Sequence, residues 1–129
     1  QSIKDSTDIY IADTIGELGV FYRLVGIVFM GGSLVEHGGQ NPLEAARLNT
    51  ALLSGPYTKN FADVYQELED AGAYLKISSG NELVEKITLL LTQPERQQGL
   101  ARASQLLVES KRGVLEMVLR ELDIFLKVM

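Results

Sequence analysis

The sequence predicts an α/β fold, in which a Rossmann-like parallel sheet carries helices on both faces and leads into a helical C-terminus. Short apolar runs alternate with segments of helical periodicity between residues 8 and 91. This alternation is typical of parallel strands joined by crossover helices. Turns that contain glycine follow two of the runs, and after residue 94 the periodicity is helical only. We therefore expect one domain, residues 1–129, with terminal helices over residues 95–129.

The first three predicted elements are a strand, a helix and a second strand. Residues 8–12 (DIYIA) are predicted as a short strand, and residues 14–25 as a helix because their apolar side chains recur at helical spacing. Residues 27–30 form an apolar run that is too short for a helix and ends before two glycines. Such a run is typical of a strand buried on both faces.

The middle of the chain continues the alternation. A helix is predicted over residues 41–48, where Pro42 suits the first turn, and a buried strand over residues 51–53. The next helix, residues 61–71, is expected to stop at Gly72. Residues 74–77 complete a predicted sheet of four strands. Asn81 is expected to cap the helix that follows, since its side-chain oxygen can accept an orphan N–H.

Two terminal helices are predicted, over residues 95–112 and 114–128, with a joint at Gly113. The second of them has apolar residues on several faces, whereas a surface helix normally has one apolar stripe. One stripe consists of Leu115, Leu119, Leu122, Leu126 and Met129. Either this helix lies in the domain's own core, or part of it covers a neighbouring domain.

The composition limits the classes of function. The 129 residues, 46% of them hydrophobic, are enough for one core of ordinary size. With 12 basic and 17 acidic residues, the net charge of −5 argues against a nucleic-acid partner. The absence of cysteine excludes disulfides and thiolate metal sites. No apolar run has the length of a membrane span, so we expect a soluble chain.

Two loops are candidates for an anion-binding site. Gly31, Gly32 and Ser33 follow a predicted parallel strand at its carboxyl end, where open α/β sheets bind ligands. Glycine lets an anion approach the backbone, and the Ser33 hydroxyl adds a donor. A tight turn without ligand is the alternative. The neighbouring loop, with Gly38 and Gly39, favours binding because it opens toward the N-terminus of the next helix.

Other residues of these loops have a structural alternative to binding. His37 is the one histidine, and it is interpreted as an orienting or sugar-contacting group because it lacks partners for a metal site. Asn41 either caps the next helix or contacts the ligand. Glu44 either complements the helix dipole or accepts hydrogen bonds from ribose hydroxyls.

Three further candidates lie on loops predicted at the same edge of the sheet. Gly16 and Glu17 open the first helix, and Asn60 follows the Gly-Pro turn after the third strand. The loops that follow parallel strands leave one edge of the sheet, so these residues could converge on one ligand. Ordinary turn formation and capping are the alternative for each of them.

The motifs as a set resemble one family of enzymes. GGSLVEHGGQNPLE (31–44), preceded by DTIGELGVFY (13–22) and followed by GPYTKNF (55–61), is similar to the C-terminal domain of the 3-deoxy-D-manno-octulosonic acid (Kdo) transferases. The resemblance implies the C-terminal half of a GT-B glycosyltransferase, a longer two-domain enzyme whose earlier strands precede residue 1. It also implies CMP-Kdo or CMP as ligand, with no cofactor and no metal.

For the whole enzyme, the resemblance implies transfer of Kdo to a lipid A precursor in lipopolysaccharide biosynthesis, at the cytoplasmic face of the bacterial inner membrane. The general base is expected in the N-terminal domain, so no catalytic residue is assigned in this chain, which should bind without turnover. Tyr57 replaces the histidine usual in the family, and Ala45 and Asn49 also depart from its pattern. A transferase for a UDP- or GDP-sugar and a non-catalytic α/β ligand-binding module remain the alternatives.

Overall fold

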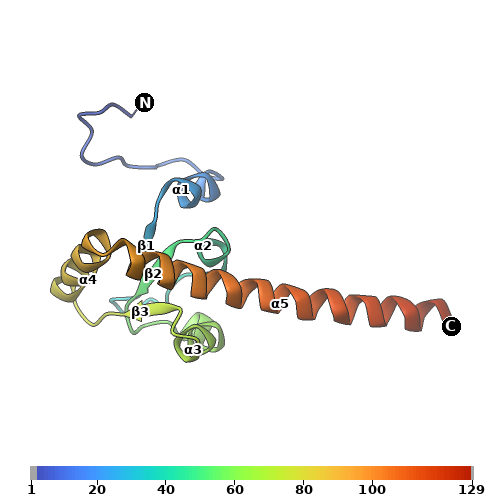
Figure 1. Ribbon diagram of the computed structural model, residues 1–129. Coiled ribbons are helices and arrows are strands. Elements are labelled where there is room, and N and C mark those ends of the chain that lie inside the picture. Colours follow the sequence, from blue (N-terminus) through green and yellow to red (C-terminus); the bar gives the residue numbers. More distant parts are fainter. Residues whose placement is uncertain (1–2, 129) are drawn as a thin grey trace.

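The computed structural model describes residues 3–128 and contains a three-stranded parallel sheet between helices (Figure 1). The strands lie in the order β1-β2-β3, with Ile27 opposite Ala51 and Leu52 opposite Tyr74. The elements in chain order are α1 (Leu18–Leu24), β1 (Ile27–Met30), α2 (Leu43–Arg47), β2 (Ala51–Ser54), the 3₁₀ helix η1 (Lys59–Phe61), α3 (Ala62–Asp70), β3 (Tyr74–Lys76), α4 (Gly80–Thr92) and α5 (Pro94–Val128).

The two faces of the sheet are both covered, as predicted. Successive side chains of a strand point to opposite faces, so Leu52 and Leu53 of β2 enter different clusters. Leu52 packs among residues of α1, α2, α3 and the middle of α5. Leu53 packs with Ile77 and Leu90, on the face covered by α4. All four residues of β2 are buried, which makes this strand the centre of the fold.

Local signals define the ends of two helices. Helix α3 ends at Asp70, and Gly72 follows its C-cap with a φ of +60° that lets Ala73 N–H donate to the Leu68 carbonyl at 2.8 Å, as in a Schellman motif. The stop predicted there is confirmed. The prediction that Asn81 caps α4 is wrong, because the Ser79 hydroxyl accepts from Glu82 N–H at 3.2 Å. Serine at the N-cap position, two residues before Asn81, satisfies an orphan N–H of the first turn.

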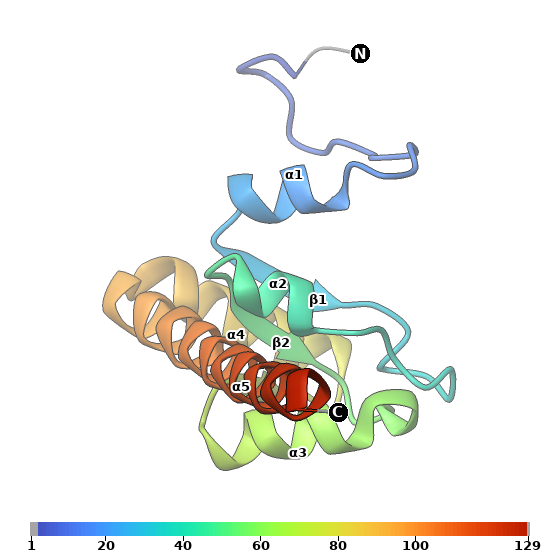
Figure 2. The same cartoon turned by 90° about the vertical axis from the view of Figure 1, so that its right-hand side faces the viewer.

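The predicted strand over residues 8–12 is not formed. Ile9 and Ile11 are 83% and 76% exposed, and the segment lies beyond α1, away from the sheet (Figure 2). A strand needs a hydrogen-bonding neighbour, and β1 pairs with β2 alone among the described residues. The helix predicted over residues 14–25 is correspondingly shorter, since α1 begins at Leu18.

Helix α5 runs without a break through Gly113, so the predicted joint is wrong. One glycine in a helix interior costs only about 1 kcal/mol relative to alanine, too little to end a helix by itself. The first half packs on the sheet through Ala101 and Ser104, both buried. The second half extends past the domain, and residues 112–128 are exposed throughout (Figure 1).

This exposure overturns the interpretation that residues 114–128 lie in the domain's own core, while cover by a neighbouring domain stays a prediction. Met129 of the predicted stripe lies outside the described residues. None of the helices in residues 3–128 combines the length and apolar character that a membrane crossing requires.

Candidate ligand-binding site

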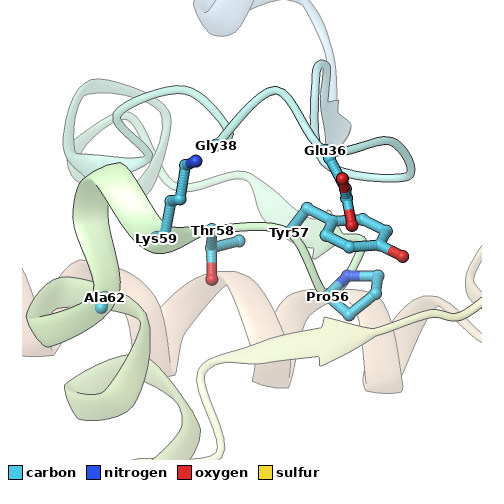
Figure 3. A pocket seen from close by; sticks show the side chains of 7 residues that line it. All are labelled: Glu36, Gly38, Pro56, Tyr57, Thr58, Lys59 and Ala62. Carbon is cyan, nitrogen blue, oxygen red and sulfur yellow. The ribbon is translucent and has the colours of Figure 1, made fainter.

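A pocket of about 540 Å³ lies where the loops after β1 and β2 leave the sheet (Figure 3). This is the carboxyl edge of the parallel strands, where α/β folds bind ligands. The loop after β1 forms one wall, and the turn after β2 with the start of α3 forms the other. The lining residues are Glu36, Gly38, Pro56, Tyr57, Thr58, Lys59 and Ala62.

Ser33 joins the two loops beneath the pocket. Its buried hydroxyl donates to the Met30 carbonyl at 2.5 Å and accepts from Gly55 N–H at 2.9 Å, while its own carbonyl accepts from Tyr57 N–H at 2.9 Å. Any Cβ on Gly55 would lie 2.2 Å from the Ser33 carbonyl oxygen, so only glycine fits there. The structure therefore gives Ser33 a positioning role, and a direct contact with a ligand stays a prediction.

Glycines shape the loop after β1. Gly32 has φ +67°, and a Cβ there would lie 2.7 Å from the His37 ring. Gly38 has φ +102°, and a Cβ there would lie 2.4 Å from the Asn60 amide nitrogen. The backbone N–H groups of Gly39 and Asn60 donate to the carbonyls of Gly32 at 3.0 Å and Gly38 at 3.2 Å. The two loops thus meet at Asn60, while their convergence on one ligand stays a prediction.

Asn41 and Glu44 lie at the start of α2 and are not among the residues that line the pocket, so a contact of either with the ligand stays a prediction. The Asn41 side-chain oxygen accepts from Leu43 N–H at 3.0 Å, which is the capping alternative stated above. The Glu44 carboxylate lies beside α1, since a Cβ on Gly19 would be 3.0 Å from one of its oxygens. Burial raises the pKa of Tyr22 on α1, and the charge of Glu44 adds to this shift.

Three more predicted residues lie outside the contacts that join the two loops. Gly16 and Glu17 precede α1, where Glu17 accepts a hydrogen bond from the Thr14 hydroxyl at 2.5 Å. Gly31 is exposed, and a Cβ there would meet nothing within 4 Å. Neither group lines the pocket. The predicted residues that the structure does bring together are Gly32, Ser33, His37, Gly38, Gly39 and Asn60.

Sequence reasoning missed several residues of the site. Glu36 and Lys59 line the pocket as charged groups, and Thr58 also lines it. A cation in a turn at the ligand-binding edge of an acidic chain was the available signal for Lys59. Tyr65 was also missed. Its hydroxyl donates to the Gln40 carbonyl at 3.2 Å, and burial raises its pKa, so the phenol keeps its proton at neutral pH and anchors the end of the loop.

This arrangement can hold a small anionic or hydroxyl-bearing ligand. It offers an ammonium group, a carboxylate, a threonine hydroxyl and a glycine backbone around one cavity. In residues 3–128 no three side chains of His, Asp or Glu gather in a way that could hold a metal ion. The expectation of a site without metal nevertheless stays a prediction.

Comparison with known proteins gives consistent relatives, although no protein-family model matches the chain. The chain is similar to 3-deoxy-D-manno-octulosonic acid transferases of Haemophilus influenzae, at 32% identity over 96% of the chain, and of Bordetella pertussis, at 30% over 90%. It covers 29% and 27% of these relatives, so it spans less than a third of their length.

A solved structure resembles most of the fold. It is the crystal structure of the C-terminal CMP-Kdo binding domain of WaaA from Acinetobacter baumannii, at 36% identity and a TM-score of 0.80. The match covers 84% of this chain and 56% of that domain. At this identity and coverage, the likeness extends to most of this chain.

Proposed function

The chain belongs with the C-terminal part of the 3-deoxy-D-manno-octulosonic acid transferases, and from this premise we propose that it is the donor-binding domain of such a glycosyltransferase, with CMP-Kdo as donor. The observation that most supports this proposal is the likeness to a CMP-Kdo binding domain together with a pocket at the carboxyl edge of the sheet. The pocket volume of about 540 Å³ is within the range for small-molecule sites.

In the proposed reaction, a hydroxyl of the acceptor attacks the anomeric carbon of Kdo while CMP departs. Negative charge gathers on the leaving phosphate. Fixed donors of the loops after β1 and β2 would stabilise that charge, and preorganised donors of this kind are a major source of catalysis. The acceptor proton needs a general base, and we assign that base to an N-terminal domain of the longer enzyme, so the isolated chain should bind without turnover.

For the whole protein, we propose a lipid A precursor as acceptor and the cytoplasmic face of the inner membrane as the place of reaction.

Within this chain, Ser33 and Tyr65 fix the shape of the loops. Gly38 and the neighbouring loop backbone face the donor. Loop donors take the place of the metal that other transferases use to hold phosphates. CMP affinity should therefore survive chelation by EDTA.

Calorimetric titration of the chain with CMP, UMP and GMP tests the proposal. We expect CMP to bind more tightly than either other nucleotide, both with and without EDTA. Tighter binding of UMP or GMP would instead indicate a transferase for another nucleotide sugar. Absence of binding to all three would contradict a donor-binding domain, and loss of CMP binding in EDTA would contradict a site without metal.

A further inference from the structure

Lys59 is the one basic residue that lines the pocket. It begins η1 in the turn after β2, and its amino group is directed toward Gly38 on the opposite loop (Figure 3). Lys76, Lys111 and Lys127 each form an ion pair with a carboxylate, whereas Lys59 has no such pair within residues 3–128. Its charge is therefore free to meet a ligand.

The charge of the whole chain makes this local cation important. The net charge of the chain is −5, so the electrostatic field of the whole molecule opposes the approach of an anion. The pocket also contains the carboxylate of Glu36. A phosphate would consequently depend on positive groups within a few ångströms, where Lys acts as a point charge for phosphate.

The loop backbone alone offers only part of the required donors. The N–H groups of Gly39, Tyr57 and Asn60 already donate to backbone carbonyls. The Ser33 hydroxyl donates to the Met30 carbonyl. A charged side chain next to Gly38 would complete the set of donors for a phosphate group.

We propose that Lys59 binds the phosphate of the donor nucleotide, an inference that rests on the proposed function. The polarity of the pocket then orients the ligand. Figure 3 shows Lys59 and Glu36 at opposite ends of the pocket, with Tyr57 on the side of Glu36. Glu36 repels the phosphate and can accept hydrogen bonds from hydroxyl groups, so the phosphate lies at the Lys59 end and sugar hydroxyls lie toward Glu36.

Three variants test this role by calorimetry with CMP and with cytidine, which lacks the phosphate. Lys59→Gln removes the charge and keeps a polar side chain, Lys59→Arg keeps the charge, and Lys127→Gln makes the same charge change at the far end of α5. We expect Lys59→Gln to weaken CMP binding about tenfold, the usual effect of one charge-assisted hydrogen bond. Cytidine binding should be unchanged, and both other variants should bind CMP within about threefold of the unmodified chain.

The dependence of CMP affinity on salt concentration is an independent test of this role. Lys59→Gln should flatten the dependence of CMP affinity on salt concentration, because one screened charge pair is lost.

Equal affinity of the Lys59→Gln and unmodified chains for CMP would overturn the role of Lys59 while leaving the proposed function intact. Equal losses for CMP and cytidine would also overturn it, since the residue would then act through the fold. A loss seen with CMP-Kdo but not with CMP would exclude the phosphate as partner. Failure of the unmodified chain to bind CMP would overturn the proposed function, and the inference with it.

Discussion

The sheet and the second half of α5 show opposite relations between apolar side chains and solvent. In β2, Leu52 and Leu53 are at most 1% exposed. On α5, Leu122 and Phe125 are 52% and 63% exposed, although both segments are rich in apolar residues. An apolar pattern therefore does not by itself place a residue in a core. Helices cover both faces of the sheet, whereas the C-terminal half of α5 projects beyond the rest of the domain (Figure 1).

The comparison also explains where the pocket lies. Its loops start from β1 and β2, which are fixed by pairing and by two buried clusters. Loops held on such strands keep their donors in place, which a binding site needs. The end of α5 offers a broad apolar surface instead, with Met117, Leu122 and Phe125 among its residues. That surface suits contact with another apolar face better than recognition of a charged donor.

The largest effect that we expect in this comparison is at Leu52. Leu52→Ala should lower the free energy of unfolding by about 2 to 5 kcal/mol, because it leaves a cavity in the central strand. Urea denaturation followed by circular dichroism measures this loss. A loss below about 1 kcal/mol would mean that β2 is not the centre of stability and would remove the contrast with α5.

Much of the fold could be predicted from the sequence because its signals are local. Strands β1, β2 and β3 lie within one residue of the predicted ranges, since each is a short apolar run bounded by turn residues. Residues 8–12 have the same character, yet they form no strand, because strand formation also requires a neighbour. The helix end predicted at Gly113 is wrong because the residues on both sides of it favour a helix.

The site was predicted less completely. The loops were located by their glycines, whose positive φ values at Gly32 and Gly38 confirm that special backbone conformations occur there. Side-chain directions could not be predicted. The Ser33 hydroxyl is used by the loops themselves, and the Glu44 carboxylate lies beside α1. Which partner a polar side chain finds depends on residues distant in sequence, such as the 22-residue separation of Ser33 and Gly55.

A smaller effect than at Leu52 is expected at Ser33, where fold and site meet. Ser33→Ala leaves the buried Gly55 N–H without its acceptor, which should cost about 1 to 3 kcal/mol of the free energy of unfolding. CMP affinity should fall as well, because the two loops lose their connection. Denaturation and calorimetric titration measure the two changes.

Ser104→Ala is the matched control for Ser33. Ser104 is also fully buried, and its hydroxyl donates to backbone carbonyls of Ala101 and Thr50 on the side of α5. Its replacement should lower stability without lowering CMP affinity in the folded chain. If both variants reduced CMP affinity equally, the effect of Ser33 would reflect general stability and not its position beneath the pocket.

The smallest effect on stability is expected at Leu122, in the exposed half of α5. Replacement of Leu122 and Phe125 by Gln should change the free energy of unfolding by about 0.5 kcal/mol or less, because neither side chain is buried and Gln is a good helix former. The same double variant should bind less of a hydrophobic dye and self-associate less than the unmodified chain, since it removes the centre of the apolar surface. Analytical ultracentrifugation and dye fluorescence measure these changes. Two results would contradict this prediction. One is an unmodified chain that is monomeric at high concentration and binds no dye, and the other is a loss of about 2 kcal/mol in the free energy of unfolding of the variant. Either would mean that the second half of α5 packs on the domain in solution, and the contrast with the sheet would disappear.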